Sequence, residues 1–176
     1  MKGYRCFLFF LLGMMILSSC ENQSANTALF EEYFQPMPLI HLPVDYPEGE
    51  QWEAIKTTYK SGEYHTCRKQ IKALYEPNDS LQAILKILDA NCILASDGST
   101  TEAIKVLQSI YKEPYPFHGI ANWYLGLAYI KNDQLDDARR VIWEIFRKEG
   151  NYQQKAARNL IDELLININD MNQPSK

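Results

Sequence analysis

The sequence predicts an all-α protein in which short helices pack as stacked hairpins. From residue 48 onward, apolar residues recur at the spacing that places them on one face of a helix. The breaks between these stretches are short and rich in Gly, Pro, Asn and Asp, which end helices and form turns. A series of short helices joined by tight turns is typical of helical hairpins. The 176 residues are enough for one domain with a hydrophobic core.

The first element is a leader at residues 1–19. Lys2 and Arg5 supply positive charge, and an apolar run follows at 6–17. This run is too short to span a bilayer, which takes about 20 apolar residues. A charged start, an apolar centre and small residues before a cleavage site are typical of a signal peptide that is removed from the mature protein.

The leader ends in the tetrapeptide Leu17-Ser18-Ser19-Cys20. It resembles the lipobox of bacterial lipoproteins at all four positions. The resemblance implies that Cys20 is acylated and becomes the first residue of a chain held on a membrane by its acyl chains. It also implies a place in the cell envelope, facing the periplasm, with the outer membrane as the expected site. The alternative is an ordinary signal peptide cut near Ser19, with Cys20 an unmodified thiol.

Two segments separate this cysteine from the helical part. Residues 20–28 are small and polar, which favours a flexible tether. Residues 29–47 contain four prolines, which forbid a long helix, yet they are too apolar for a free linker. We expect one short helical turn near 28–34, followed by an extended strap that lies against the domain.

Seven helices are expected over residues 48–168, with residues 169–176 as a C-terminal tail. The helices end at turn-forming residues, among them Gly62, Gly98 and the pair Asn132-Asp133. The predicted helices are 48–60, 63–75, 81–96, 100–113, 117–131, 134–148 and 151–168.

Small residues recur along these helices at a nearly constant interval. Cys67, Ala103 and Ala138 follow one another at distances of 36 and 35 residues. One small residue in a helix has little meaning, but three at one phase predict a repeated helical unit.

The last of these units carries the clearest motif. Leu125, Gly126, Tyr129 and Ala138 have the spacing of the tetratricopeptide repeat, a helix–turn–helix unit of 34 residues, and the chain resembles that family here. The resemblance implies that Gly126 and Ala138 allow the two helices of the hairpin to approach closely. The tryptophan of the family is displaced by one residue, to Trp123.

The resemblance implies about three repeats over residues 48–152, with 151–168 as a solvent-facing capping helix. The first two units depart from the family, because Ile55 and Asn91 stand where the repeat has its glycine. A tight contact between the paired helices is therefore less expected there.

The resemblance also implies a concave groove lined by the first helix of each hairpin. Aromatic side chains with interspersed lysines suit an extended peptide, since rings supply contact area and lysines pair with carboxylates. In the alternatives, Trp52 and Trp123 pack between repeats, or the strap 29–47 fills the groove itself. The residues expected to line the groove are Trp52, Lys56, Tyr59, Lys60, Leu88, Asp89, Trp123, Tyr124, Leu127 and Lys131.

Two cysteines remain in the helical part, in a compartment that permits disulfides. A bond between Cys67 and Cys92 is one reading of the sequence. We favour the other, in which each is a small buried residue at a contact between helices.

The sequence carries no recognisable catalytic or cofactor motif, and we expect neither an enzyme nor a bound cofactor. Its three histidines stand apart, without the paired spacing of a zinc site. Asp133, Asp136 and Asp137 lack calcium-loop spacing and suit the first turn of a helix. Because the 22 acids exceed the 18 bases, nucleic acid is not an expected partner.

These observations predict a lipid-anchored scaffold of the cell envelope that binds a protein or peptide in its groove. The alternative is a periplasm-facing subunit that binds a small molecule or peptide for a regulatory or uptake complex.

Overall fold

A computed structural model of the protein describes residues 25–39, 49–74, 81–96, 98–111, 117–148 and 152–171, without the side chains of Leu81 and 166–171. Within these ranges the chain forms eight helices and no strand, which confirms the all-α prediction. The predicted leader, its Cys20, strap residues 40–47 and the end of the tail lie outside the described residues.

Seven of the eight helices coincide with the predicted ones, with ends that differ by at most three residues. The other helix, α2, begins inside the stretch expected to be a tether and is longer than the expected helical turn. The helices are α2 (Ala25–Tyr33), α3 (Glu50–Lys60), α4 (Tyr64–Ala73), α5 (Leu81–Leu94), α6 (Thr100–Tyr111), α7 (His118–Lys131), α8 (Leu135–Arg147) and α9 (Gln154–Met171).

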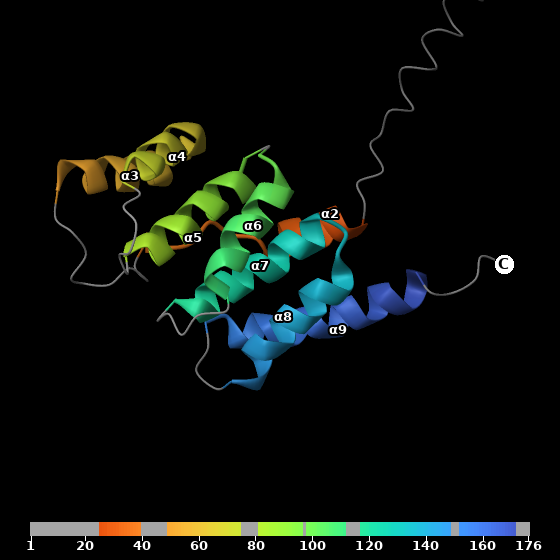
Figure 1. Ribbon diagram of the computed structural model, residues 1–176. Coiled ribbons are helices and arrows are strands. Elements are labelled where there is room, and N and C mark those ends of the chain that lie inside the picture. Colours follow the sequence, from red (N-terminus) through yellow and green to blue (C-terminus); the bar gives the residue numbers. More distant parts are fainter. Residues whose placement is uncertain are drawn as a thin grey trace, which may run out of the picture.

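From α3 to α9, each helix packs against the next helix in the chain (Figure 1). Two further contacts break this simple order: α5 also touches α7, and α2 lies against α7 although about ninety residues separate them. The helices thus follow one another from α3 and α4 at the upper left of Figure 1 to α8 and α9 at the bottom.

The core is centred on α5 and α7. Every residue of α7 from Ile120 to Ile130 is buried, and so is nearly all of α5 beyond Ala83. A helix that is buried all round needs neighbours on every side. Helices α2, α5, α6 and α8 all pack against α7.

Gly126 allows α7 and α8 to lie very close together. A Cβ atom at this position would stand 2.4 Å from Cδ1 of Ile142 on α8, and the main chain of Ala138 is also near. In the first hairpin, the fully buried Cys67 of α4 points its thiol at the carbonyl of Ile55 on α3, with 3.7 Å between sulfur and oxygen. Gly126 and Ala138 are twelve positions apart, as are Ile55 and Cys67, so the two hairpins have close contacts at corresponding positions.

Two of the predicted turns have left-handed backbone. Gly62 has φ of +77° between α3 and α4, a conformation that glycine adopts without strain. Asp133 has φ of 57° between α7 and α8, and aspartate is among the few other residues that tolerate this region. After Asp133, the amide of Gln134 donates to the carbonyl of Tyr129 at 2.9 Å and closes the turn.

Cys67 and Cys92 are free, buried thiols. The neighbouring thiol of Cys67 and burial both raise the pKa of Cys92, so this thiol stays protonated. The pair lies where α4 packs against α5 and serves as apolar packing at that contact.

Candidate functional site

The site is the side of α7 that is covered by residues 25–39, called here the N-terminal segment. This segment consists of α2 and the extended residues that follow it. Its side chains Leu29, Phe30 and Met37 are all buried, with Met37 exposing 1% of its surface. The part of the strap that the structure describes therefore lies against the domain, and it contributes to the core.

Aromatic rings make up much of this contact. Tyr33 packs edge-on against Trp123, with 6.4 Å between ring centres, and Phe34 meets Tyr124 in the same way at 6.2 Å. Edge-to-face pairs at such distances stabilise a contact beyond the area that they bury.

The ring of Phe30 is held on two sides. It stacks on Phe34 with 4.8 Å between ring centres, and the ammonium of Lys131 lies 4.6 Å above it. The same Lys131 donates a hydrogen bond to the carbonyl of Leu94 at 2.9 Å, which fixes its position at the end of α5. A cation over an aromatic face adds electrostatic attraction to the packing.

Two side chains of the domain bind the main chain of the extended part. The amide of Met37 donates to Oδ1 of Asn91 on α5 at 3.0 Å, and the hydroxyl of Tyr124 on α7 donates to the carbonyl of Gln35 at 2.9 Å. Asn91 is oriented by its own amide, which donates to the carbonyl of Ile87. Main-chain hydrogen bonds beside a buried side chain are how proteins recognise extended peptides.

Polar contacts also join α2 to α9 and to the turn between α7 and α8. The hydroxyl of Tyr33 donates to Oε1 of Glu163 on α9 at 2.5 Å. The amide of Asn26 donates to Oδ1 of Asp133 in the turn between α7 and α8 at 2.8 Å. The N-terminal segment thus contacts α5, α7, the turn after α7, and α9.

Burial holds the phenols of this site in the neutral, donating form. Desolvation raises the pKa of Tyr124, and the neighbouring Tyr152 adds to the effect. Desolvation also raises the pKa of Tyr33, followed by its hydrogen bond to Glu163. Both tyrosines are therefore hydrogen-bond donors and not anions at neutral pH.

Most residues expected to line an open groove are buried in the structure. Lys60 is exposed, while Lys56, ion-paired with Glu53, and Lys131 are half-buried. Trp123 and Tyr124 of α7 lie against the N-terminal segment, as expected for the alternative in which the strap fills the groove. The buried ones are Trp52, Tyr59, Leu88, Asp89, Trp123, Tyr124 and Leu127.

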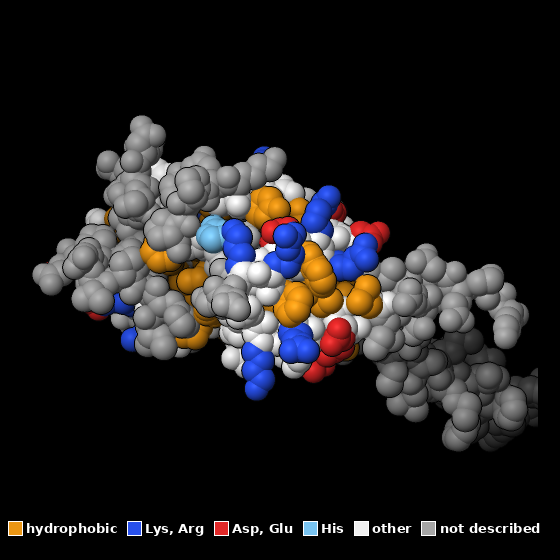
Figure 2. Space-filling model, turned by 90° about the horizontal axis from the view of Figure 1, so that it is seen from below, with side chains coloured by type: hydrophobic (Ala, Val, Ile, Leu, Met, Phe, Trp, Pro, Cys, Tyr) orange, Lys and Arg blue, Asp and Glu red, His pale blue; other side chains and the backbone are white. Residues whose placement is uncertain are grey.

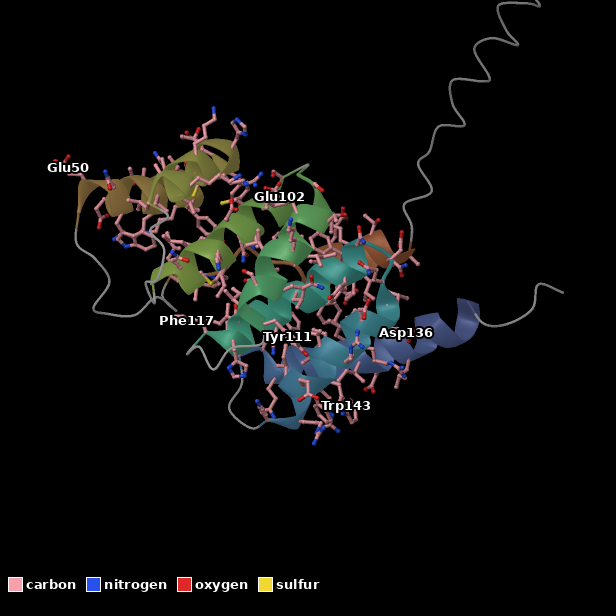
Figure 3. All side chains as sticks on the ribbon, viewed as in Figure 1. Glu50, Glu102, Tyr111, Phe117, Asp136 and Trp143 are labelled. Carbon is pink, nitrogen blue, oxygen red and sulfur yellow. The ribbon has the colours of Figure 1, made fainter. Side chains whose placement is uncertain are left out.

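Asp89 has a different role from the one expected. It exposes 2% of its surface and accepts a hydrogen bond from Nε of Arg68 on α4 at 2.7 Å. The same guanidinium donates to Glu102 on α6 at 2.6 Å, near the top of Figure 3. Burial lowers the pKa of Arg68, but the two carboxylates together raise it further, so it stays charged. This triad joins three helices and holds the buried Asp89 against Arg68 of α4.

A small cavity of about 190 Å³ remains between the N-terminal segment, α7 and α9. Pockets for small-molecule ligands are usually about 300–1,000 Å³, so the cavity is too small for most of them. Its walls include Tyr33, Trp123, Tyr124 and Tyr152.

Among the residues that the structure describes, no three His, Cys, Asp or Glu side chains come together as metal ligands. A search of the same residues finds no helix that is long and apolar enough to cross a membrane.

The sequence analysis missed three contacts that define this site: Asn91 with Met37, Tyr124 with Gln35, and Tyr33 with Glu163. A signal was present for the first. Asn91 occupies the position where the repeat has its glycine, within a mostly apolar part of the helix, and a buried amide needs a hydrogen-bond partner. The other two join segments far apart in the chain and have no sequence signal.

Comparisons with protein-family models, curated proteins and solved structures find no match for this chain.

Proposed function

We propose that the protein is a lipid-anchored interaction module of the bacterial cell envelope, with a peptide-binding groove occupied by its own N-terminal segment. The main observation is a pair of hydrogen bonds to the main chain beside the buried Met37: Asn91 accepts from the amide of Met37, and Tyr124 donates to the carbonyl of Gln35. Contacts to the main chain accept many sequences, so another extended segment of similar shape fits the same site.

Several features support a tetratricopeptide-like arrangement of the domain. The helices pair as α3 with α4, α5 with α6 and α7 with α8, with α9 following as a last helix. The close approach at Gly126 and the equivalent contact of Cys67 agree with a repeated hairpin. In such an arrangement α5 and α7 are first helices of neighbouring repeats, which explains why they touch.

The lipobox-like Leu17-Ser18-Ser19-Cys20 supports the lipid anchor. Metabolic labelling of the full chain with palmitate tests it, because Cys20→Ala removes the thiol to be acylated. Cys67→Ala is the matched control, since this thiol is buried. We expect label in the wild type and in the control, and loss of label in Cys20→Ala. Label that persists in Cys20→Ala contradicts the anchor.

A partner must displace the N-terminal segment to reach the groove. The segment is covalently attached and is present at a high effective concentration, so it competes strongly with a free peptide. The module is thus closed until a tighter ligand arrives, or until the segment is pulled away.

The test of the groove is binding of a synthetic peptide with the sequence of residues 25–39. The receptor is the full chain with Phe30→Asp and Met37→Asp, which weaken its own segment, or with the milder Phe30→Ala. The control peptide carries the same two aspartates. We expect the peptide to bind these variants at least about tenfold more tightly than the wild type, which is about 1.4 kcal/mol. If the peptide binds no better than the control peptide, the groove proposal is wrong.

The small-molecule alternative finds less support at this site, because the remaining cavity is about 190 Å³.

A further inference from the structure

A second surface, formed by α8 and α9, is separate from the proposed groove. A hollow of about 780 Å³ lies along α8 and is bordered by Ile161 and Leu165 of α9. Trp143 and Leu165 expose 44% and 40% of their surface and are the two most exposed large hydrophobic side chains that the structure describes. Figure 2, which views the molecule from below, shows hydrophobic side chains lying among Lys and Arg on this face.

The exposed side of α8 forms one stripe. Residues separated by three, four, seven or eleven positions lie on the same face of a helix. The buried residues Ala138, Val141, Ile142 and Ile145 face the core, so this stripe points directly away from it. Figure 3 shows Asp136 and Trp143 on this outer side. The stripe consists of Asp136, Arg139, Arg140, Trp143, Glu144 and Arg147.

The charges along the stripe are arranged so that two antiparallel copies of α8 place opposite charges face to face. If two copies of α8 lie antiparallel about a twofold axis near residues 141–142, Asp136 of one copy faces Arg147 of the other. On one flank of the contact Arg140 faces Glu144 of the second copy, and on the other flank Arg139 faces the ring of Trp143. By the symmetry of the axis each contact occurs twice, which gives four ion pairs and two cation–π contacts.

We propose that this face of α8 pairs with the same face of a second copy of the chain. A partner of one charge sign would be matched by a surface of the opposite sign, but this stripe carries both signs in a self-complementary order. Trp143 and Leu165 supply the apolar centre, and charged residues surround them, as in protein interfaces generally.

The present ion pairs of the stripe do not oppose this pairing. Arg139 bonds Asp136, Arg140 bonds Asp137, and Arg147 lies 3.9 Å from Glu144, all within α8 and three residues apart. Exposed pairs of this kind contribute little to stability, so exchanging them for contacts with a second copy costs little. The face is small, and the pairing is accordingly weak and reversible.

Charge reversal at Arg140 and Glu144 tests the proposal. Full-length chains with two different C-terminal affinity tags are co-expressed, and capture of one tag is followed by quantification of the other. Arg140→Glu with itself places two glutamates together at each contact, and Glu144→Arg with itself places two arginines together. A mixture of the two variants restores both opposite-charge contacts.

We expect capture between wild-type copies, at least about tenfold loss for either variant with itself, and recovery for the mixture. Lys69→Glu, at an exposed site on α4, is the control and should leave capture unchanged. Recovery in the mixture would also exclude misfolding as the cause of the loss, because each chain in the mixture carries the same substitution that it carried alone. Equal capture for all combinations, no capture between wild-type copies, or no recovery in the mixture overturns the proposal.

Discussion

The two helices of the third hairpin, α7 and α8, have opposite environments. Helix α7 is buried on every side, and the N-terminal segment covers its Trp123 and Tyr124. Helix α8 buries one stripe and leaves a charged stripe with Trp143 open. The first site is therefore closed by the chain itself, while the second is accessible without any rearrangement. Under the two proposals above, the α7 contact would be regulated by the N-terminal segment, whereas the α8 contact would need no such release.

This comparison predicts that aromatic truncations have very different effects on the two faces. Phe30→Ala removes a ring that is 4% exposed, stacked on Phe34 and covered by Lys131. We expect a loss of about 3–5 kcal/mol in the free energy of unfolding, as for other buried phenylalanines. Urea denaturation followed by circular dichroism measures it.

A much smaller loss of unfolding free energy, with faster hydrogen exchange confined to α2 and α7, would show that the N-terminal segment detaches as a unit. The free energy of detachment would then be the largest loss that a substitution within the segment can cause. A small loss without local exchange contradicts the observed packing of Phe30.

The next largest loss of stability is expected from removing the hydrogen bond between Asn91 and the main chain of Met37. Asn91→Leu leaves the amide of Met37 without its acceptor in a buried place. We expect a loss of about 1–3 kcal/mol, which is the usual cost of an unsatisfied buried group. Gln108→Leu is the matched control, because this exposed side chain bonds the hydroxyl of Tyr129 near the surface and should cost less. Equal losses for the two variants would mean that the buried Asn91 contact stabilises the fold no more than the exposed Gln108 contact does.

A pH dependence follows from the buried phenols. Unfolded tyrosines ionise near pH 10, whereas the raised pKa values of Tyr124 and Tyr33 keep these groups protonated in the folded state. Their contribution to stability is therefore complete below about pH 10 and is lost as the pH rises above it toward the raised values. Urea denaturation at a series of pH values should show this fall.

Tyr124→Phe separates this effect from general alkaline unfolding. It removes the donor to Gln35 and should cost about 0.5–1.5 kcal/mol near neutral pH. It should also make the stability fall less steeply above pH 10, since one phenol fewer ionises on unfolding. An unchanged slope would show that Tyr124 ionises equally easily in both states.

The sequence predicted the helices well because their signals are local. Apolar spacing defined each helix, and residues such as Gly62 and Asp133 defined the turns between them. The close contact at Gly126 also has a local signal, because a glycine inside a helix costs stability unless a neighbour needs the space.

The environment of α7 was harder to predict, because it depends on a segment about ninety residues away. Trp123 and Tyr124 were interpreted as lining an open groove, yet residues 120–130 contain hardly any polar side chain. A helix that is apolar on all sides belongs in a core, and this pattern favours the alternative in which the strap fills the groove. What sequence could not supply was the register of the strap, which the contacts of Met37 and Gln35 define.

The smallest expected effect is on the open face. Trp143→Ala removes a ring that is 44% exposed and packs mainly against Phe146 of the same helix, with 5.3 Å between ring centres. A surface change of this kind usually alters the free energy of unfolding by no more than about 0.5 kcal/mol. The same variant should weaken capture between copies, because the apolar centre of the α8 face is lost. Little change in stability together with weaker association assigns Trp143 to recognition. A large loss of stability would instead make it part of the core, and the contrast between α7 and α8 would not hold.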